Sequence, residues 1–193
     1  MPYRSYPGTH HKGAYFVRGS GHNRFGAYTE DSHEYQDVVD RLLVKWETAR
    51  DMVPGPVMRQ ASKPTTLGII AYGSSDGAVT EAMDELSGDG IYADYLRLRA
   101  FPFNKEVKEF VDSHKTIFVV EQNRDAQLRG LLILETNTDA AKLVPVLHYN
   151  GMPIPSDCIV DIVRKHRQRE LAAGPSSPNR ESNCRASRST TSG

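Results

Sequence analysis

The first long amphipathic pattern of the chain predicts a helix from about Ser32 to Met52. Its apolar residues recur at intervals of three and four, which gathers them into one stripe along a helix. The stripe consists of Tyr35, Val38, Val39, Leu42, Leu43, Trp46 and Ala49. Asp31 or Ser32 can cap the start of the helix, and Pro54-Gly55-Pro56 ends it. Such a stripe needs a covering surface, because an uncovered one would promote aggregation or dimerisation.

From Thr66 onward, short apolar runs alternate with amphipathic stretches. Strands are expected at about 67–72, 91–98, 116–121 and 142–148, and helices at about 78–86, 104–114, 125–134 and 155–172. Strands separated by helices predict βαβ units and therefore a parallel sheet. Right-handed crossovers then place helices on both faces of that sheet. The predicted fold class is an α/β domain over residues 64–172, an open, mostly parallel sheet in a Rossmann-like three-layer sandwich.

Three segments flank this domain. Residues 1–32 are rich in Gly, Tyr, His, Ser and Thr without a period, and they are expected to form an irregular loop. Residues 33–63 hold nearly all of the helix and most of a Pro-punctuated linker, which runs from Pro54 to Thr65 and leads into the domain. Residues 173–193 hold no apolar anchor and are expected to be a disordered tail.

The charge distribution argues against nucleic acid as the main partner. The 193 residues have a formal net charge of zero, but residues 164–193 carry seven Lys or Arg against two Glu. The rest of the chain then holds 17 Lys and Arg against 22 Asp and Glu, so it is acidic. Phosphate binding needs a basic footprint, which this body lacks. We interpret the basic end as a solvated tail.

Cysteine usage and hydropathy indicate a cytoplasmic protein. Cys158 and Cys184 form no CxxC pattern, so this chain alone is not expected to hold an iron–sulfur cluster, a structural zinc ion or a disulfide framework. Cys158 is expected to be a small core residue on the last helix. No apolar run approaches membrane-spanning length, and the N-terminus shows no signal-peptide pattern. No membrane partner is expected.

The loop Gly73-Ser74-Ser75-Asp76-Gly77 is the first candidate site. It lies between a predicted strand and a helix N-terminus, where backbone N–H groups favour an anion such as a phosphate or carboxylate. It matches neither GxGxxG nor the P-loop pattern. The alternative is a tight turn in which Ser74 or Ser75 caps the helix.

A second polar cluster, Glu121-Gln122-Asn123-Arg124-Asp125, follows the third strand of the domain. Ligand sites in open parallel sheets gather at the carboxyl ends of strands, so the cluster is well placed for a ligand or a partner subunit. In particular, Glu121, Asn123 and Arg124 are candidates for an anion or interface site. The alternative is structural: Glu121 pairs with Arg124 or Arg129, and Asp125 caps the next helix, as Asn104 caps the helix before it.

Other patterns do not predict a self-sufficient enzyme. The histidines at 10, 11, 22 and 33 are dense, but their spacing matches no metal-ligand pattern, and no metal site is expected. Ser74 lacks a GxSxG context, and no Cys–His pair is suggested.

Several motifs resemble, in order, the C-terminal part of bacterial 2-oxoacid:acceptor oxidoreductase α subunits. The resemblance covers about residues 3–168. Its motifs are Tyr6-Pro7-Gly8-Thr9-His10, Lys12-Gly13-Ala14, Arg18-Gly19, Tyr28-Thr29-Glu30-Asp31, Leu42-Leu43-Val44-Lys45-Trp46-Glu47-Thr48-Ala49, Leu96-Arg97-Leu98-Arg99-Ala100-Phe101-Pro102-Phe103, Val119-Val120-Glu121-Gln122-Asn123-Arg124-Asp125 and Leu147-His148-Tyr149-Asn150-Gly151-Met152-Pro153-Ile154.

The resemblance implies a transketolase C-terminal-like domain in a thiamine-dependent complex. Such enzymes, named pyruvate or 2-oxoglutarate:ferredoxin oxidoreductases, decarboxylate a 2-oxoacid and transfer the acyl group to coenzyme A. A partner β subunit holds thiamine diphosphate, Mg²⁺ and commonly an iron–sulfur cluster, and ferredoxin takes the electrons. The resemblance also implies that residues 33–63 come from a preceding domain. We therefore expect a C-terminal fragment of an α subunit, a structural and assembly domain that is inactive alone.

The sequence departs from the pattern that the resemblance implies at two positions. Ala126 stands where the resemblance leads us to expect Gly after Arg-Asp, and Asn150 stands where we expect Asp before Gly. The resemblance further implies that the Gly-rich N-terminal loop reaches the subunit interface or the substrate. We expect these contacts from His22, Arg24, Thr29, Glu30 and Asp31.

Two other functions remain open. One is an anion- or nucleotide-binding Rossmann-like module that uses the Gly73–Gly77 loop. The other is a stand-alone thiamine enzyme of a different kind, which is disfavoured because the sequence has no GDG…N magnesium pattern.

Overall fold

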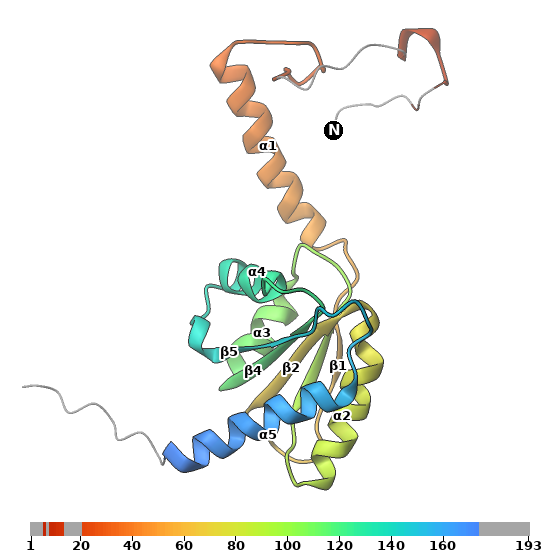
Figure 1. Cartoon of the computed structure of the whole chain (residues 1–193). Helices are drawn as coiled ribbons and strands as arrows, with labels where there is room; N and C mark the ends of the chain where they lie inside the picture. Colours follow the sequence, from red (N-terminus) through yellow and green to blue (C-terminus); the bar gives the residue numbers. More distant parts are fainter. Residues whose placement is uncertain (1–5, 7, 14–20, 174–193) are drawn as a thin grey trace, which may run out of the picture.

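The computed structural model describes residues 6, 8–13 and 21–173, and these residues contain a five-stranded sheet of order β1-β3-β2-β4-β5 (Figure 1). The strands are β1 (Val57–Arg59), β2 (Leu67–Tyr72), β3 (Asp94–Leu98), β4 (Thr116–Glu121) and β5 (Leu143–Leu147). Strands β2 to β5 are parallel, and β1 pairs antiparallel with β3 at one edge. The predicted open, mostly parallel sheet is confirmed.

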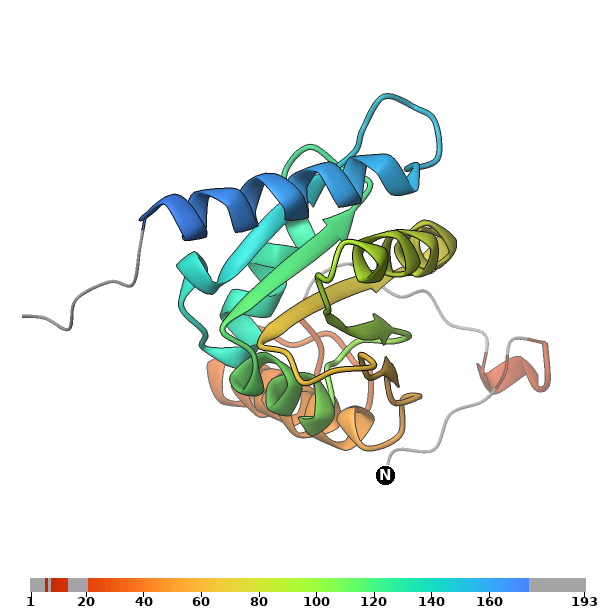
Figure 2. The same cartoon turned by 90° about the horizontal axis from the view of Figure 1, so that it is seen from below.

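Helices cover both faces of the sheet (Figure 2). The helices of the described residues are α1 (Ser32–Arg50), α2 (Asp76–Gly88), α3 (Lys105–Ser113), α4 (Gln127–Thr136) and α5 (Ser156–Ala173), with short 3₁₀ turns at His11–Gly13, Gly73–Ser75 and Ala140–Lys142. Helices α2 and α5 pack on one face, and α3 and α4 pack on the other. This is the predicted three-layer sandwich.

Strand β4 shows why the sheet forms. All six of its residues are buried, and its side chains alternate between the two cores. Phe118 and Val120 pack toward α2 and α5, while Ile117 and Val119 pack toward α3 and α4. A strand that is apolar on both faces is stable only in the middle of such a sandwich.

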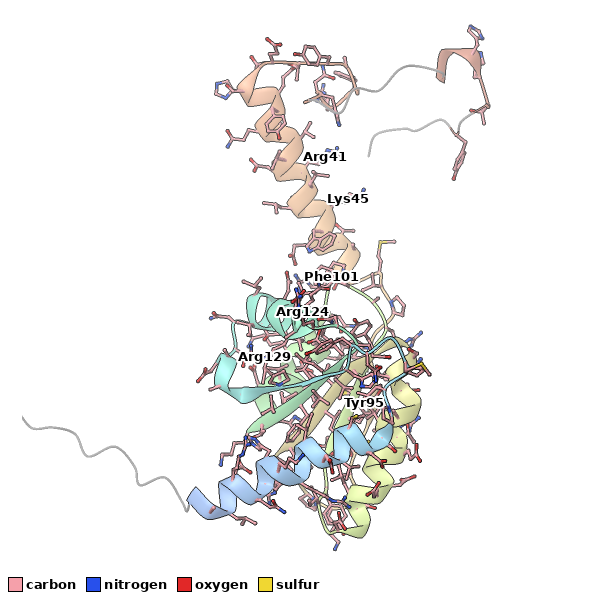
Figure 3. All side chains as sticks on the ribbon, viewed as in Figure 1. Arg41, Lys45, Tyr95, Phe101, Arg124 and Arg129 are labelled. Carbon is pink, nitrogen blue, oxygen red and sulfur yellow. The ribbon has the colours of Figure 1, made fainter. Side chains whose placement is uncertain are left out.

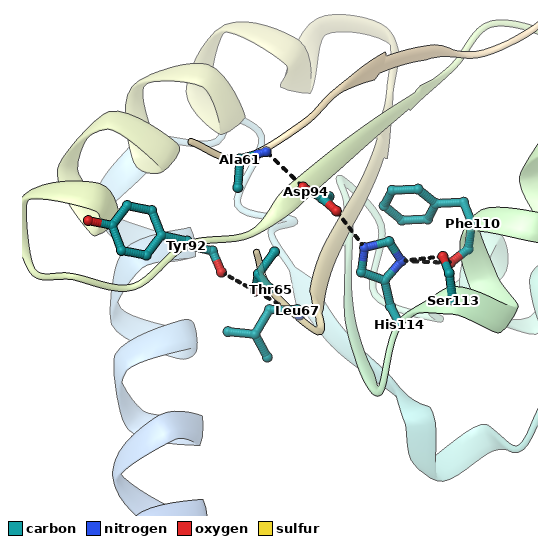
Figure 4. Close-up of polar contacts among 8 residues, drawn as sticks. All are labelled: Ala61, Thr65, Leu67, Tyr92, Asp94, Phe110, Ser113 and His114. Atoms are coloured by element: carbon teal, nitrogen blue, oxygen red, sulfur yellow. Dashed lines mark hydrogen bonds and ion pairs between the residues drawn. The ribbon is translucent and has the colours of Figure 1, made fainter. Parts of the chain in front are cut away.

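The amino ends of the strands are held by a polar network around Asp94 and His114 (Figure 4). One carboxylate oxygen of Asp94 accepts the backbone N–H of Ala61 at 2.7 Å, and the other lies 3.1 Å from His114 Nε2. The other ring nitrogen of His114 lies 2.7 Å from the Phe110 carbonyl oxygen. A side chain at Gly68 would place its Cβ 2.9 Å from the Phe110 ring, so this close approach requires glycine.

The structure corrects several predicted boundaries. The expected linker 54–65 contains β1, an edge strand with three exposed residues that sequence periodicity cannot detect. The strand expected at 91–98 begins only at Asp94, and the helix expected at 78–86 extends from Asp76 to Gly88. Asn104 occupies the N-cap position of α3, but within the described residues its side chain makes no capping hydrogen bond.

Helix α1 stands away from the sandwich and meets it at its C-terminal end (Figure 1). Asp31 caps its start, as predicted, by accepting the backbone N–H groups of His33 and Glu34. At the other end, Arg50 Nη1 donates to the Phe103 carbonyl oxygen at 2.7 Å. Most of the predicted apolar stripe is exposed, and of its members only Val38 is buried.

Candidate functional site at the carboxyl edge of the sheet

The loops that follow β2 and β4 are joined by hydrogen bonds. Gln122 Nε2 donates to the hydroxyl oxygens of Ser74 and Ser75, each at 3.2 Å. Gly73, with φ +62°, starts the turn in a left-handed conformation that glycine favours. Ser75 occupies the N-cap position of α2, as predicted, but no side-chain hydrogen bond among the described residues caps the helix. The two serines instead hold the loops together.

Glu121 is fully buried at the end of β4 and caps helix α4. Its carboxylate accepts Asn123 Nδ2 at 2.7 Å, the Leu128 backbone N–H at 2.8 Å and the Arg129 backbone N–H at 3.1 Å. A carboxylate at a helix N-terminus satisfies N–H groups that have no partner within the helix, and it also suits the helix dipole. No local pattern in the sequence signals this cap, because the capping residue precedes the helix by six positions.

The predicted ion pairs and cap in this cluster are wrong. Arg124 pairs with Asp125 at 2.7 Å instead of with Glu121. The Arg129 guanidinium donates to the carbonyl oxygens of Leu143 and Ala140, each at 2.7 Å, and so holds β5 against α4. Asp125 does not cap α4, because Ala126 takes the N-cap position and only Glu121 supplies a carboxylate there within the described chain.

The start of α2 is not arranged to attract an anion. Asp76 lies in its first turn, and its carboxylate accepts the Tyr95 hydroxyl at 2.9 Å and lies 3.2 Å from Arg97 Nη1. A negative side chain at this position already complements the helix dipole and would repel a second anion. Burial, together with the hydrogen bond to Asp76, raises the pKa of the Tyr95 phenol. Tyr95 is therefore a neutral hydrogen-bond donor that fixes Asp76.

An apolar cleft of about 480 Å³ lies beside the two loops. It is lined by Tyr72, Gly73, Leu98, Arg99, Ala100, Phe101, Phe103, Gln127, Leu128 and Leu131. Sequence reasoning missed this cleft. The signal that could have found it was the pair of aromatic residues on either side of Pro102, whose peptide bond with Phe101 is cis.

Comparison with known proteins agrees with this architecture. Residues 66–153 match the protein family described as pyruvate:ferredoxin oxidoreductase core domain II. A 2-oxoacid:ferredoxin oxidoreductase subunit alpha from Saccharolobus solfataricus is 27% identical over 164 residues, which are 81% of this chain and 26% of that protein. The chain is similar to a part of these α subunits. The resemblance drawn from the motifs is confirmed.

A solved structure shows the same fold. The 2-oxoglutarate:ferredoxin oxidoreductase from Magnetococcus marinus, with 2-oxoglutarate, coenzyme A and succinyl-CoA bound, has a TM-score of 0.68 and 24% identity to this chain. The likeness covers 82% of this chain and 27% of that one. The chain therefore spans about a quarter of the length of the relatives it matches.

The two positions where the resemblance led us to expect other residues fall on turns of unusual backbone geometry. Ala126 adopts φ +52° and ψ +46°, a left-handed conformation in which the expected Gly would be unstrained. Asn150 accepts the Met152 backbone N–H through Oδ1 at 2.9 Å and precedes Gly151, whose φ is +86°. An Asp at position 150 could accept the same hydrogen bond, so this second change is structurally mild.

The structure does not bring the predicted N-terminal loop residues to the carboxyl edge of the sheet. They lie at the outer end of α1 (Figure 1). His22 Nδ1 lies 2.8 Å from the Asn23 carbonyl oxygen, and the Arg24 guanidinium lies 4.7 Å from the centre of the Phe25 ring.

The same loop ends in contacts that prepare the start of α1. The Tyr28 hydroxyl donates to the Glu30 carboxylate, and the Thr29 hydroxyl oxygen accepts the Asp31 backbone N–H. The backbone N–H groups of Glu34 and His33 lower the pKa of the Asp31 carboxyl. Asp31 thus caps a helix within the described structure, and its contact with a partner subunit stays a prediction.

The remaining predicted groups show one unexpected pair. Cys158 is partly buried against the core, and its Sγ lies 4.0 Å from His148 Nδ1, although the sequence suggested no Cys–His pair. Cys184 and the tail 174–193 lie outside the described residues. Among residues 6, 8–13 and 21–173, no three or more His, Cys, Asp or Glu side chains gather as a metal site. No helix in this part of the chain could cross a membrane.

Proposed function

We propose that the chain is a structural and subunit-assembly part of a thiamine-dependent 2-oxoacid:ferredoxin oxidoreductase. That enzyme would oxidatively decarboxylate a 2-oxoacid such as 2-oxoglutarate or pyruvate to the acyl-CoA. The observation that carries the proposal is the match of residues 66–153 to pyruvate:ferredoxin oxidoreductase core domain II. In addition, the polar groups at the candidate site of this domain already form hydrogen bonds with one another. Glu121, for example, accepts three hydrogen bonds from this chain and is fully buried, so it is not positioned to take a substrate proton.

In the proposed complex, this chain binds a β subunit that carries thiamine diphosphate, Mg²⁺ and the iron–sulfur cluster. Thiamine diphosphate supplies the carbanion chemistry at the keto carbon when it is bound. The described residues do not fit Mg²⁺ or a cluster, since no group of carboxylates, histidines and cysteines gathers among them. Coenzyme A and ferredoxin would be used by the complex, in the cytoplasm. Residues 33–63 would connect this domain to the preceding part of an α subunit.

The test is binding and turnover with a β subunit encoded in the same genome. We expect the purified chain to co-elute with that subunit. We also expect the chain alone to show no 2-oxoacid-dependent dye reduction with coenzyme A, thiamine diphosphate and Mg²⁺. Turnover by the chain alone would contradict the assembly role, and so would a failure to bind the β subunit.

The loop residues His22, Arg24, Thr29, Glu30 and Asp31 are proposed to contact the β subunit or the substrate region of that complex. The exposed positions of Arg24 and Glu30 at the outer end of α1 support this proposal. Arg24→Ala should then reduce turnover of the full complex without lowering the melting temperature of the chain. Wild-type turnover of Arg24→Ala and Asp31→Ala complexes would refute it.

A second candidate is an anion- or nucleotide-binding module. The left-handed turn at Gly73 before helix α2 favours it, whereas the Asp76 carboxylate in the first turn opposes it. A ligand that binds only the folded state must raise the melting temperature. We expect no shift with inorganic phosphate, ATP or NAD, and a saturable shift that Gly73→Ala abolishes would establish this candidate instead.

A further inference from the structure

Four side chains of α1 form an exposed apolar ridge, which we name the α1 stripe. They are Tyr35, Val39, Leu42 and Trp46, with exposed fractions of 53, 40, 50 and 42%. Their spacing of four, three and four residues keeps them on one side of the helix. At 1.5 Å per residue, the stripe rises about 17 Å from Tyr35 to Trp46, which is long enough for a partner helix or strand to lie against it.

The α1 stripe continues into the cleft at the carboxyl edge of the sheet. The Trp46 ring contacts the Phe101 ring edge-on, with 5.2 Å between the ring centres. Phe101 in turn contacts Phe103 at 5.0 Å, and both rings line the cleft. Arg50 fixes this junction because it binds the Phe103 carbonyl oxygen from the last turn of α1. One continuous apolar surface therefore runs from the helix onto the sandwich.

Cations lie along one edge of this surface. Arg41 and Lys45 stand one turn apart on the same flank of α1 (Figure 3), and Arg99 lines the cleft. None of the three forms an ion pair with a carboxylate within the described part of the chain. Asp40 and Glu47 flank the other edge of the α1 stripe, Asp37 lies on the opposite side of the helix, and Glu34 lies at its outer end.

We propose that the α1 stripe and the cleft form one docking surface for another polypeptide, the partner subunit of the proposed complex. The partner presents an apolar ridge with Asp or Glu along the edge that meets Arg41, Lys45 and Arg99. Large contiguous apolar surfaces mark interaction sites, and unpaired cations beside them select an acidic rim. The inference rests on the proposed function, because it names where the assembly occurs.

Matched substitutions on two sides of α1 test the docking surface. Leu42→Asp places a charge on the α1 stripe, whereas Val44→Asp places the same charge on the far side of the helix, where Val44 is 67% exposed. We expect Leu42→Asp to weaken binding of the β subunit at least tenfold and Val44→Asp to leave it unchanged. The thermal midpoint of the sandwich should stay the same in both, since α1 meets the domain only through its last turns in Figure 1.

The double variant Arg41→Glu with Lys45→Glu tests the charge. Wild-type binding should weaken as salt rises, because exposed charges are screened, and the variant should bind more weakly and lose this dependence. If the β subunit binds and neither Leu42→Asp nor the charge reversal weakens it, the proposed function stands and the docking surface is wrong. If the β subunit does not bind at all, both are wrong. A homodimer that Leu42→Asp dissociates would assign the surface to a second copy and overturn the proposal.

Discussion

Replacement of Ala126 by Gly should stabilise the domain. Ala126 has φ +52°, and the left-handed conformation costs an L-residue roughly 1–2 kcal/mol. Glycine removes this strain, but its extra freedom in the unfolded chain takes back about 0.4–1 kcal/mol. The net gain is therefore about 0.5–1 kcal/mol. For a domain of this size, it corresponds to a rise in Tm of about 2–4 °C.

The assay is thermal and urea unfolding of wild type and Ala126→Gly, followed by circular dichroism. Gly73→Ala is the matched control: Gly73 has φ +62°, and no atom of the described chain lies within 4 Å of an added Cβ. It should destabilise by about the amount that Ala126→Gly stabilises, because both changes act through the same backbone strain. A fall in Tm for Ala126→Gly would refute the reasoning and would show that packing of the Ala126 methyl group outweighs the strain.

Two further changes probe buried polar groups. Glu121→Gln should lower the free energy of unfolding in urea by about 2–4 kcal/mol, because an NH₂ group would face backbone N–H donors of α4. Asp125→Asn, in the exposed ion pair with Arg124, should lower it by less than about 1 kcal/mol. Equal losses in the two variants would contradict the capping role of Glu121. The raised pKa of Tyr95 predicts alkaline destabilisation: its phenol ionises near the ordinary value of 10.0 only in the unfolded chain, so stability is full below pH 10 and falls above it. Tyr95→Phe should flatten the fall of Tm between about pH 10 and 12, and an unchanged slope would contradict it.

The parallel sheet could be predicted because its signal is local. Strands β2 and β4 are apolar on both faces, and such runs between helices are typical of the centre of a parallel sheet. Strand β1 could not be predicted, since its three residues are exposed and show no alternation of buried and exposed positions. It forms by pairing with β3, which lies far along the chain. The formation of such an edge strand depends more on the neighbouring strand than on the hydrophobic pattern of its own sequence.

The places of the two polar loops could be predicted, but their hydrogen bonds could not. Both loops were expected at strand ends, and the structure joins them through Gln122. Opposite charges close in sequence suggested ion pairs for Glu121, yet backbone N–H groups of α4 reach its carboxylate first. Charges that are close in sequence do not reveal which hydrogen-bond donors the fold brings next to the carboxylate. Similarly, the stripe on α1 was predicted, but its junction with the cleft depends on how Arg50 and Trp46 dock.

The Glu121 cap has a consequence for how the domain folds. The first turn of α4 is completed by a carboxylate that is in place only when β4 has entered the sheet. An isolated helix of ten residues is marginal in water, so α4 cannot be an early, independent helix. The amide protons of Leu128 and Arg129 should therefore exchange with solvent only when the sheet itself opens, at the slow rate of β4 and unlike the fraying ends of ordinary helices. Helix α4 is therefore expected to form only after the central strand β4 has joined the sheet.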